Sequence, residues 1–171
     1  MNRSTVPQLF LWLFVISAGL VSGGSIFERL VVTPLWAASP PESVTQWQLG
    51  GIQGAFFGVA SPLYGVFALG LAIAARWMPR RQRSWALMAG VSGVVTVVWT
   101  AAYFLPILQK TQVTAGAGLS GEEITSLVNQ FHTWQWSRWA LLIGGWLAGL
   151  RALSLTVSAR SPGSDGLRGA G

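Results

Sequence analysis

The residues best suited to chemistry gather in one short stretch, residues 132–139. His132 is the only histidine of the chain. Because an unperturbed imidazole titrates at a pH of about 6.5, His132 is suited to act as a general base near neutral pH. The alternative is a surface or interfacial role. Arg138 lies in an apolar run of the same stretch, and a charge at such a position is expected to have a partner or a function.

Glu28 is the acidic residue best placed to pair with Arg138. Glu28 lies near the end of the first apolar block, and Arg138 lies near the start of the last one. An opposite-charge pair inside a membrane is either part of a functional site or a structural clasp, and the sequence leaves both open. Arg151 is close enough to the opposite membrane face for its long side chain to reach water.

Trp134, Gln135 and Trp136 are the predicted substrate-binding residues around Arg138. Trp134 precedes Arg138 by four residues, so the two share a helix face and could form a cation–π contact. The alternative is a belt of tryptophans at the membrane interface, where indole rings are common. If the rings line a cavity instead, we expect it to open near the outer leaflet.

Membrane-spanning helices must position these residues. The chain has 171 residues, of which 51% are hydrophobic and only 9% charged, whereas a soluble domain is about 25% charged. Each apolar block is long enough to cross the hydrocarbon core as a helix, so we predict an all-α, integral membrane four-helix bundle. Pro34 and Pro106 are expected to end the first and third helices. The predicted helices cover residues 9–32, 52–75, 85–108 and 134–157.

The distribution of basic residues predicts the orientation. The connection between the second and third blocks is the densest run of positive charge, so it is expected in the cytoplasm together with both termini. The plasma membrane, which is the inner membrane of a bacterium, is the predicted location. The net charge of +6 then reflects membrane topology, and we expect no nucleic acid partner. The arginines of this connection are Arg76, Arg80, Arg81 and Arg83.

The segments outside the apolar blocks add three predictions. Ser120 and Glu123 have the spacing of a capping box, which predicts a short amphipathic helix leading into the fourth block. Residues 158–171 are rich in Gly and Ser and are predicted to form a disordered cytoplasmic tail. Glycines four residues apart predict close packing within the bundle, with a homo-oligomer face as the alternative. These pairs are Gly19 and Gly23, Gly54 and Gly58, and Gly145 and Gly149.

The residue inventory gives no support for a metal or cofactor site. The chain has no cysteine and a single histidine, which excludes disulfides and thiolate ligands and leaves too few imidazoles for haem ligation. No phosphate-binding loop or nucleophile elbow is present. We therefore expect neither a metal nor a cofactor.

Over roughly residues 14–155, the pattern resembles the anthrone oxygenase-like family of small four-helix membrane proteins, most of whose bacterial members have no assigned function. The resemblance rests on a glycine-rich first helix that leads into Val31-Val32-Thr33-Pro34-Leu35. It also rests on Pro106 near the end of the third helix and on the Trp134-x-x-x-Arg138 start of the last one.

Characterised fungal members are oxygenases that convert an anthrone to an anthraquinone with molecular oxygen. The resemblance implies His132 as the base, Arg138 as the cation that stabilises the developing anion, and Trp134 and Trp136 as stacking walls. The sequence favours a protein that binds a lipophilic small molecule near the outer leaflet. A cofactor-independent oxygenase and an accessory subunit of a membrane complex are the alternatives.

Overall fold

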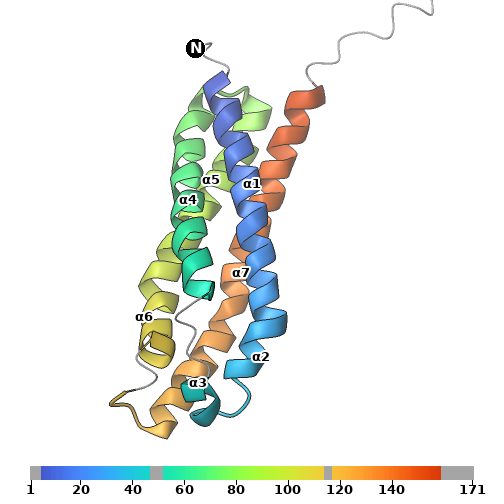
Figure 1. Ribbon diagram of the computed structural model, residues 1–171. Coiled ribbons are helices and arrows are strands. Elements are labelled where there is room, and N and C mark those ends of the chain that lie inside the picture. The colour runs from blue at the N-terminus through green and yellow to red at the C-terminus, as the bar shows by residue number, and fades with distance from the viewer. Residues whose placement is uncertain (1–4, 47–51, 114–116, 159–171) are drawn as a thin grey trace, which may run out of the picture.

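The computed structural model describes residues 5–46, 52–113 and 117–158, and its regular elements are all helical. Four long helical rods stand side by side and alternate in direction (Figure 1). A short helix, α3 (Glu42–Gln46), lies between the first and second rods in sequence. The rods are α1 (Thr5–Phe27) with a π-helical turn (Glu28–Val32) and α2 (Thr33–Trp36); α4 (Ile52–Ala74) with a 3₁₀ turn (Ala75–Trp77); α5 (Arg80–Trp99) with a π turn (Thr100–Phe104), α6 (Leu105–Leu108) and a further π turn (Gln109–Val113); and α7 (Gly121–Ser158).

All four rods are long and apolar enough to cross a membrane. The described residues form one bundle without strands, so the predicted all-α, four-helix architecture is confirmed. α1 begins, and α7 ends, at the same end of the bundle as the connection between α4 and α5 (Figure 1). We call this the arginine-rich end, because Arg76 and Arg80 lie there, and we call the opposite end, where α3 lies, the α3 end.

The fourth helix is longer than predicted. α7 begins at Gly121, so residues 121–133 are its first turns. The predicted capping box is present: the Glu123 amide donates to Ser120 Oγ at 3.2 Å, and the Ser120 amide donates to Glu123 Oε2 at 2.7 Å. The early turns bury Ile124, Val128 and Phe131, which recur at helical spacing and give this polar segment an apolar face. The predicted tail lies outside the described residues, apart from Ser158 at the end of α7.

The expectation that Pro34 and Pro106 end their helices is wrong. Each proline comes two residues after a π turn, in which the hydrogen bond spans five residues. The Thr33 amide donates to the Glu28 carbonyl, and the Leu105 amide donates to the Thr100 carbonyl. Proline lacks an amide proton, and its ring clashes with the carbonyl four residues earlier. The wider π turn provides space for this ring, and the rod therefore continues.

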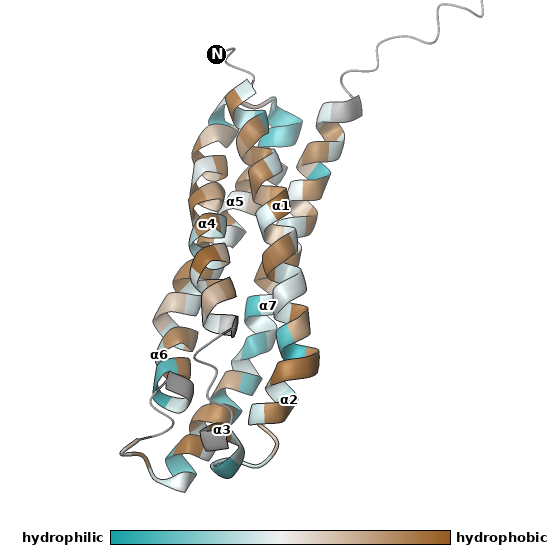
Figure 2. Cartoon of the chain, in the orientation of Figure 1, coloured by the Kyte–Doolittle hydropathy of each residue, from teal (hydrophilic) through white to brown (hydrophobic). Residues whose placement is uncertain are grey.

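The bundle has two apolar cores. The first is formed by α1, α4, α5 and α7 around residues such as Phe14, Leu71 and Leu142. The second lies at the α3 end, where Trp36 and Phe131 are fully buried. α4 contributes only to the first core, because it begins at Ile52, well short of the α3 end (Figure 1). Figure 2 shows hydrophilic residues on α7 between the two cores.

Close packing of the rods depends on glycines that differ in part from the predicted pairs. Gly145 and Gly149 pack inside the bundle, where an added Cβ would lie 3.0 Å from Ser92 and Phe14 respectively. Gly54 and Gly58 have no neighbouring atom within 4 Å of an added Cβ. The tightest backbone contact is at Gly90, where a Cβ would come within 2.8 Å of the Ala68 carbonyl oxygen.

We predict that Gly90→Ala destabilises the protein by about 1–3 kcal/mol, because the new methyl group forces α4 and α5 apart. The matched control is Gly58→Ala on exposed α4, where the added methyl group meets no neighbouring atom and improved helix propensity makes the change neutral or slightly stabilising. Unfolding of both variants in detergent micelles measures the difference. Equal stability of the two variants would contradict the close approach.

Candidate functional site

Glu28 and Arg138 form a buried ion pair. Arg138 Nη2 donates to Glu28 Oε2 at 3.4 Å, and Arg138 and Glu28 are only 8% and 6% exposed. Glu28 is the first residue of the π turn after α1, and Arg138 lies on α7. The pairing predicted from the sequence is therefore present in the structure. It joins the first and last rods at the level between the two apolar cores.

The predicted stacking of Trp134 on Arg138 is not formed. The Arg138 guanidinium lies instead over the ring of Phe104, 5.2 Å from its centroid. Trp134 points toward the third rod, where its ring meets Trp99 and Tyr103 edge-on at 6.1 and 6.2 Å. The early start of α7 explains the difference, because Arg138 lies in the middle of a long helix, between neighbouring rods, and has a buried carboxylate within reach.

Arg29 and His132 form a second pair beside the first. Arg29 Nη1 lies 3.0 Å from His132 Nδ1. Because a guanidinium can only donate, Nδ1 of a neutral imidazole must accept, which leaves the proton on Nε2. The edge of the Trp36 ring packs against His132, with the centroids 6.2 Å apart. In this arrangement the basic nitrogen of His132 is occupied, so His132 could act as a general base only after Arg29 moves away.

Gln135 is the most deeply buried of the predicted site residues, with 2% of its surface exposed. Neither its Nε2 nor its Oε1 has a hydrogen-bond partner within the described part of the chain. Gln135 lines a small cleft together with Arg29, Trp136 and Trp139, and the cleft has a volume of about 10 Å³. We call it the Arg29 cleft.

The two predicted stacking residues lie apart from each other. Trp136 is 64% exposed, borders the Arg29 cleft and packs edge-on against Trp139, with ring centroids 5.6 Å apart. Trp134 is 47% exposed and borders a wide hollow near Pro41 at the α3 end. Gln135, Arg138 and His132 thus lie on the side of α7 that faces the first rod, where Glu28 is located. Trp134 instead contacts the third rod.

Buried polar atoms without a partner concentrate on the first and last rods. An unpaired buried group costs about 1–3 kcal/mol, and Gln135 has both of its polar side-chain atoms in this state. Arg29 and Trp139 are not among the site residues predicted from the sequence, although Arg29 follows Glu28 directly and Trp139 lies one helical turn after Gln135. The residues on these two rods whose buried atoms lack a partner in the described chain are Ser22, Thr33, Trp36, His132, Gln135, Arg138, Trp139 and Trp146.

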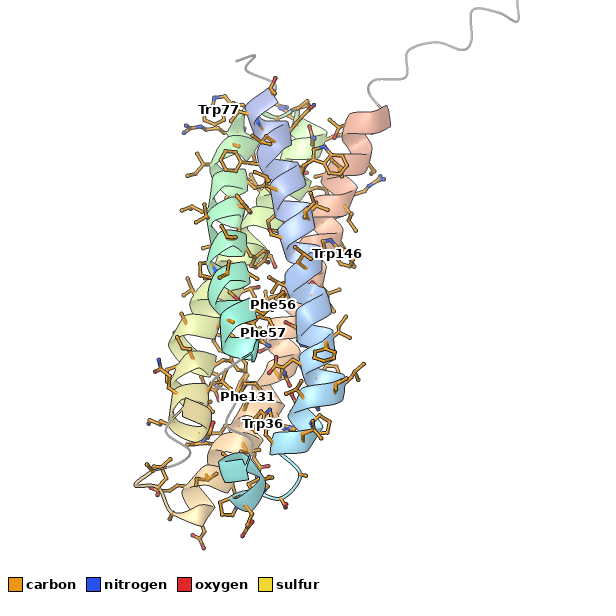
Figure 3. The ribbon with its side chains drawn as sticks, viewed as in Figure 1. Trp36, Phe56, Phe57, Trp77, Phe131 and Trp146 are labelled. Carbon is orange, nitrogen blue, oxygen red and sulfur yellow. The ribbon has the colours of Figure 1, made fainter. Side chains whose placement is uncertain are left out.

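A larger apolar hollow lies on the surface of α1, and we call it the α1 notch. Gly19, Gly23 and Gly24 form its floor, and its volume is about 820 Å³. Phe56 and Phe57 lie on one side of α1, and Trp146 lies on the other (Figure 3). Phe27 also lines the notch, and the next residue along the chain is Glu28. The notch therefore adjoins the buried ion pair.

The fold and the site together define a helical bundle with four helices apolar enough to span a membrane, with a buried ion pair and an apolar notch beside it. Comparisons with protein-family models, curated proteins and solved structures find no match to the chain. The resemblance to the anthrone oxygenase-like family therefore stays a prediction.

We predict that Glu28→Gln and Arg138→Met each destabilise the protein by about 3–5 kcal/mol, because each leaves an uncompensated buried charge or an unpaired polar group. The double variant removes both charges and should lose less stability than either single change. A double-mutant cycle of unfolding free energies in micelles measures the coupling. Arg151→Met is the matched control, because Arg151 is exposed on the same helix. Additive losses would show that the two residues do not interact.

Proposed function

We propose that the chain is an integral membrane protein that binds a lipophilic small molecule in the α1 notch, near the outer leaflet, with both termini in the cytoplasm. The observation that carries the proposal is the notch itself. Its volume of about 820 Å³ lies within the range of about 300–1,000 Å³ typical of small-molecule sites.

The lengths of the rods support this placement in the membrane. The second rod has 24 residues in its apolar span, or about 36 Å at 1.5 Å per residue, which suits a hydrocarbon core of about 30 Å. With the arginine-rich end in the cytoplasm, the start of α4 marks the outer boundary of the core. Gly24 of α1 packs against Phe56, so Glu28, one turn further along, lies at that boundary.

The lining of the notch supports a lipophilic ligand that enters from the bilayer. Its walls are aliphatic and aromatic, and side chains on its rim such as Ile16 and Leu20 are more than half exposed. Trp146 borders the notch with its ring, while its indole Nε1 is buried against Gly19, so the contacts that the notch offers are apolar.

A topology experiment tests the orientation. We expect a phosphatase reporter that is active only outside the cytoplasm to be inactive when fused after the last residue. The same reporter inserted between residues 46 and 52 should be active, because α3, which ends at Gln46, lies at the α3 end. Activity of the C-terminal fusion would reverse the proposed orientation.

We predict that Gly23→Leu abolishes binding in the notch without unfolding the protein. An added Cβ at Gly23 meets no atom within 4 Å, so the new side chain occupies the space meant for the ligand. Anthracene, a flat apolar hydrocarbon, is the probe, and energy transfer from tryptophan reports its binding in nanodiscs. Gly58→Leu, which is equally open but does not line the notch, should bind normally. Unchanged, saturable binding by Gly23→Leu would contradict the proposal.

The oxygenase alternative has one observation in its favour, namely that His132 lies next to the buried pair through Arg29. The same nanodisc sample supplied with an anthrone and oxygen distinguishes the two functions. A binding protein should leave the rate of anthraquinone formation at the level of protein-free nanodiscs. A faster rate that is lost in His132→Ala and Arg138→Met, but kept in Arg151→Met, would establish the oxygenase.

A further inference from the structure

We propose that the Arg29 cleft binds an acidic headgroup, so that the ligand is an anionic amphiphile with its apolar tail in the α1 notch and its carboxylate or phosphate oxygen against Arg29. This inference rests on the proposed function and specifies the chemical class of the ligand. It assigns binding roles to Arg29 and Trp139, which the sequence patterns do not single out.

The first reason is an uncompensated positive charge. Glu28 pairs with Arg138, while the Arg29 guanidinium is directed at the neutral ring of His132. Among the described residues, no carboxylate forms an ion pair with Arg29. Two guanidinium groups and one carboxylate thus meet between the first and last rods. Glu28 interacts electrostatically with both guanidinium groups, so one positive charge remains in excess, and an anionic ligand supplies the missing counter-charge.

The second reason is the set of hydrogen-bond donors around the cleft. Gln135 and Trp139 both line it with apolar atoms, and the Gln135 amide and the Trp139 indole Nε1 lie buried behind this lining without partners in the described chain, so a ligand oxygen reaches them once these side chains turn. Arg29 adds a guanidinium with further donors besides the one directed at His132. Donors that include a cation favour an oxyanion, because charge-assisted hydrogen bonds are about twice as strong as neutral ones.

The third reason is the arrangement of the two hollows. Phe27 lines the α1 notch, and Arg29, two residues later, lines the cleft. The cleft has a volume of about 10 Å³, which suits an atom group the size of one water molecule and therefore a single headgroup oxygen. An amphiphile lying along the first rod would place its tail toward the membrane centre and its headgroup toward the outer boundary, which is the orientation of a lipid in the outer leaflet.

A matched pair of probes tests the inference in nanodiscs of phosphatidylcholine. Brominated stearic acid and brominated stearyl alcohol have the same tail and differ in the headgroup charge, and bromine quenches nearby tryptophans such as Trp139 and Trp146. We expect the acid to bind at least about tenfold more tightly, which corresponds to about 1.4 kcal/mol. Equal affinity of the two probes would overturn the inference. Absence of saturable quenching by either probe would instead refute the proposed function.

Variants locate the headgroup. Arg29→Gln should remove most of the preference for the acid, whereas Arg151→Gln, the same charge change on an exposed residue of α7, should keep it. Trp139→Phe retains a ring but loses the indole donor, and it should weaken acid binding by about threefold and leave alcohol binding unchanged, as expected for one lost hydrogen bond. Anthracene binding reports whether each variant is folded. If Arg29→Gln binds anthracene and still prefers the acid, the inference is wrong; if it binds no anthracene, the Trp139→Phe result decides.

A third arm identifies the source of the acidic headgroup. Nanodiscs that contain phosphatidylglycerol offer a phosphate that competes with the fatty acid. If phosphatidylglycerol displaces the brominated acid from the unchanged protein but not from Arg29→Gln, a membrane phospholipid occupies the site. Retention of the acid would show that a free fatty acid or a similar carboxylate is preferred. Both results support an oxyanion site, and displacement that persists in Arg29→Gln would count against it.

Discussion

Two opposite charges, Glu28 and Arg138, meet 3.4 Å apart between the first and last rods of the bundle. Charges buried in an apolar layer must be paired, because neither can be solvated there at reasonable cost. This requirement sets the relative height of α1 and α7 and places a polar layer between the two apolar cores. On one side of this layer α4 completes a four-helix core, and on the other side α3 and three rods form the second core (Figure 1).

The π turns explain how the ion pair fits into continuous helices. Glu28 begins the π turn of the first rod, and Phe104 ends the earlier of the two π turns of the third rod. Both residues contact Arg138, one as a counter-charge and the other as a ring beneath the guanidinium. A π turn adds one residue to the helical turn, and such turns are frequent at functional sites. In both rods a proline comes two residues later, so the feature that accommodates the proline also shapes the site.

The proposed ligand-binding function rests on two hollows at the first rod, the α1 notch and the Arg29 cleft. The α1 notch supplies apolar volume, and the Arg29 cleft supplies donors and an unbalanced positive charge. Each alone is a common feature of helical membrane proteins. The proposed ligand, with an apolar tail and an acidic head, follows from taking the two features together. In the structure His132 contacts Arg29 through its Nδ1.

Composition and hydrophobic block lengths determined the four apolar helices, because a chain with 9% charged residues cannot cover a soluble surface. The capping box and the pairing of Glu28 with Arg138 were also readable, since both follow from spacing and from the cost of a lone charge. The unbroken run of α7 from Gly121 into the fourth block, the passage of helices through Pro34 and Pro106, and the contact of Arg138 with Phe104 were decided by tertiary structure. They depend on which neighbouring rod a side chain meets, and single-helix periodicity carries no such information. The roles of Arg29 and Trp139 belong to the same group, because a cleft exists only once two distant helices pack together.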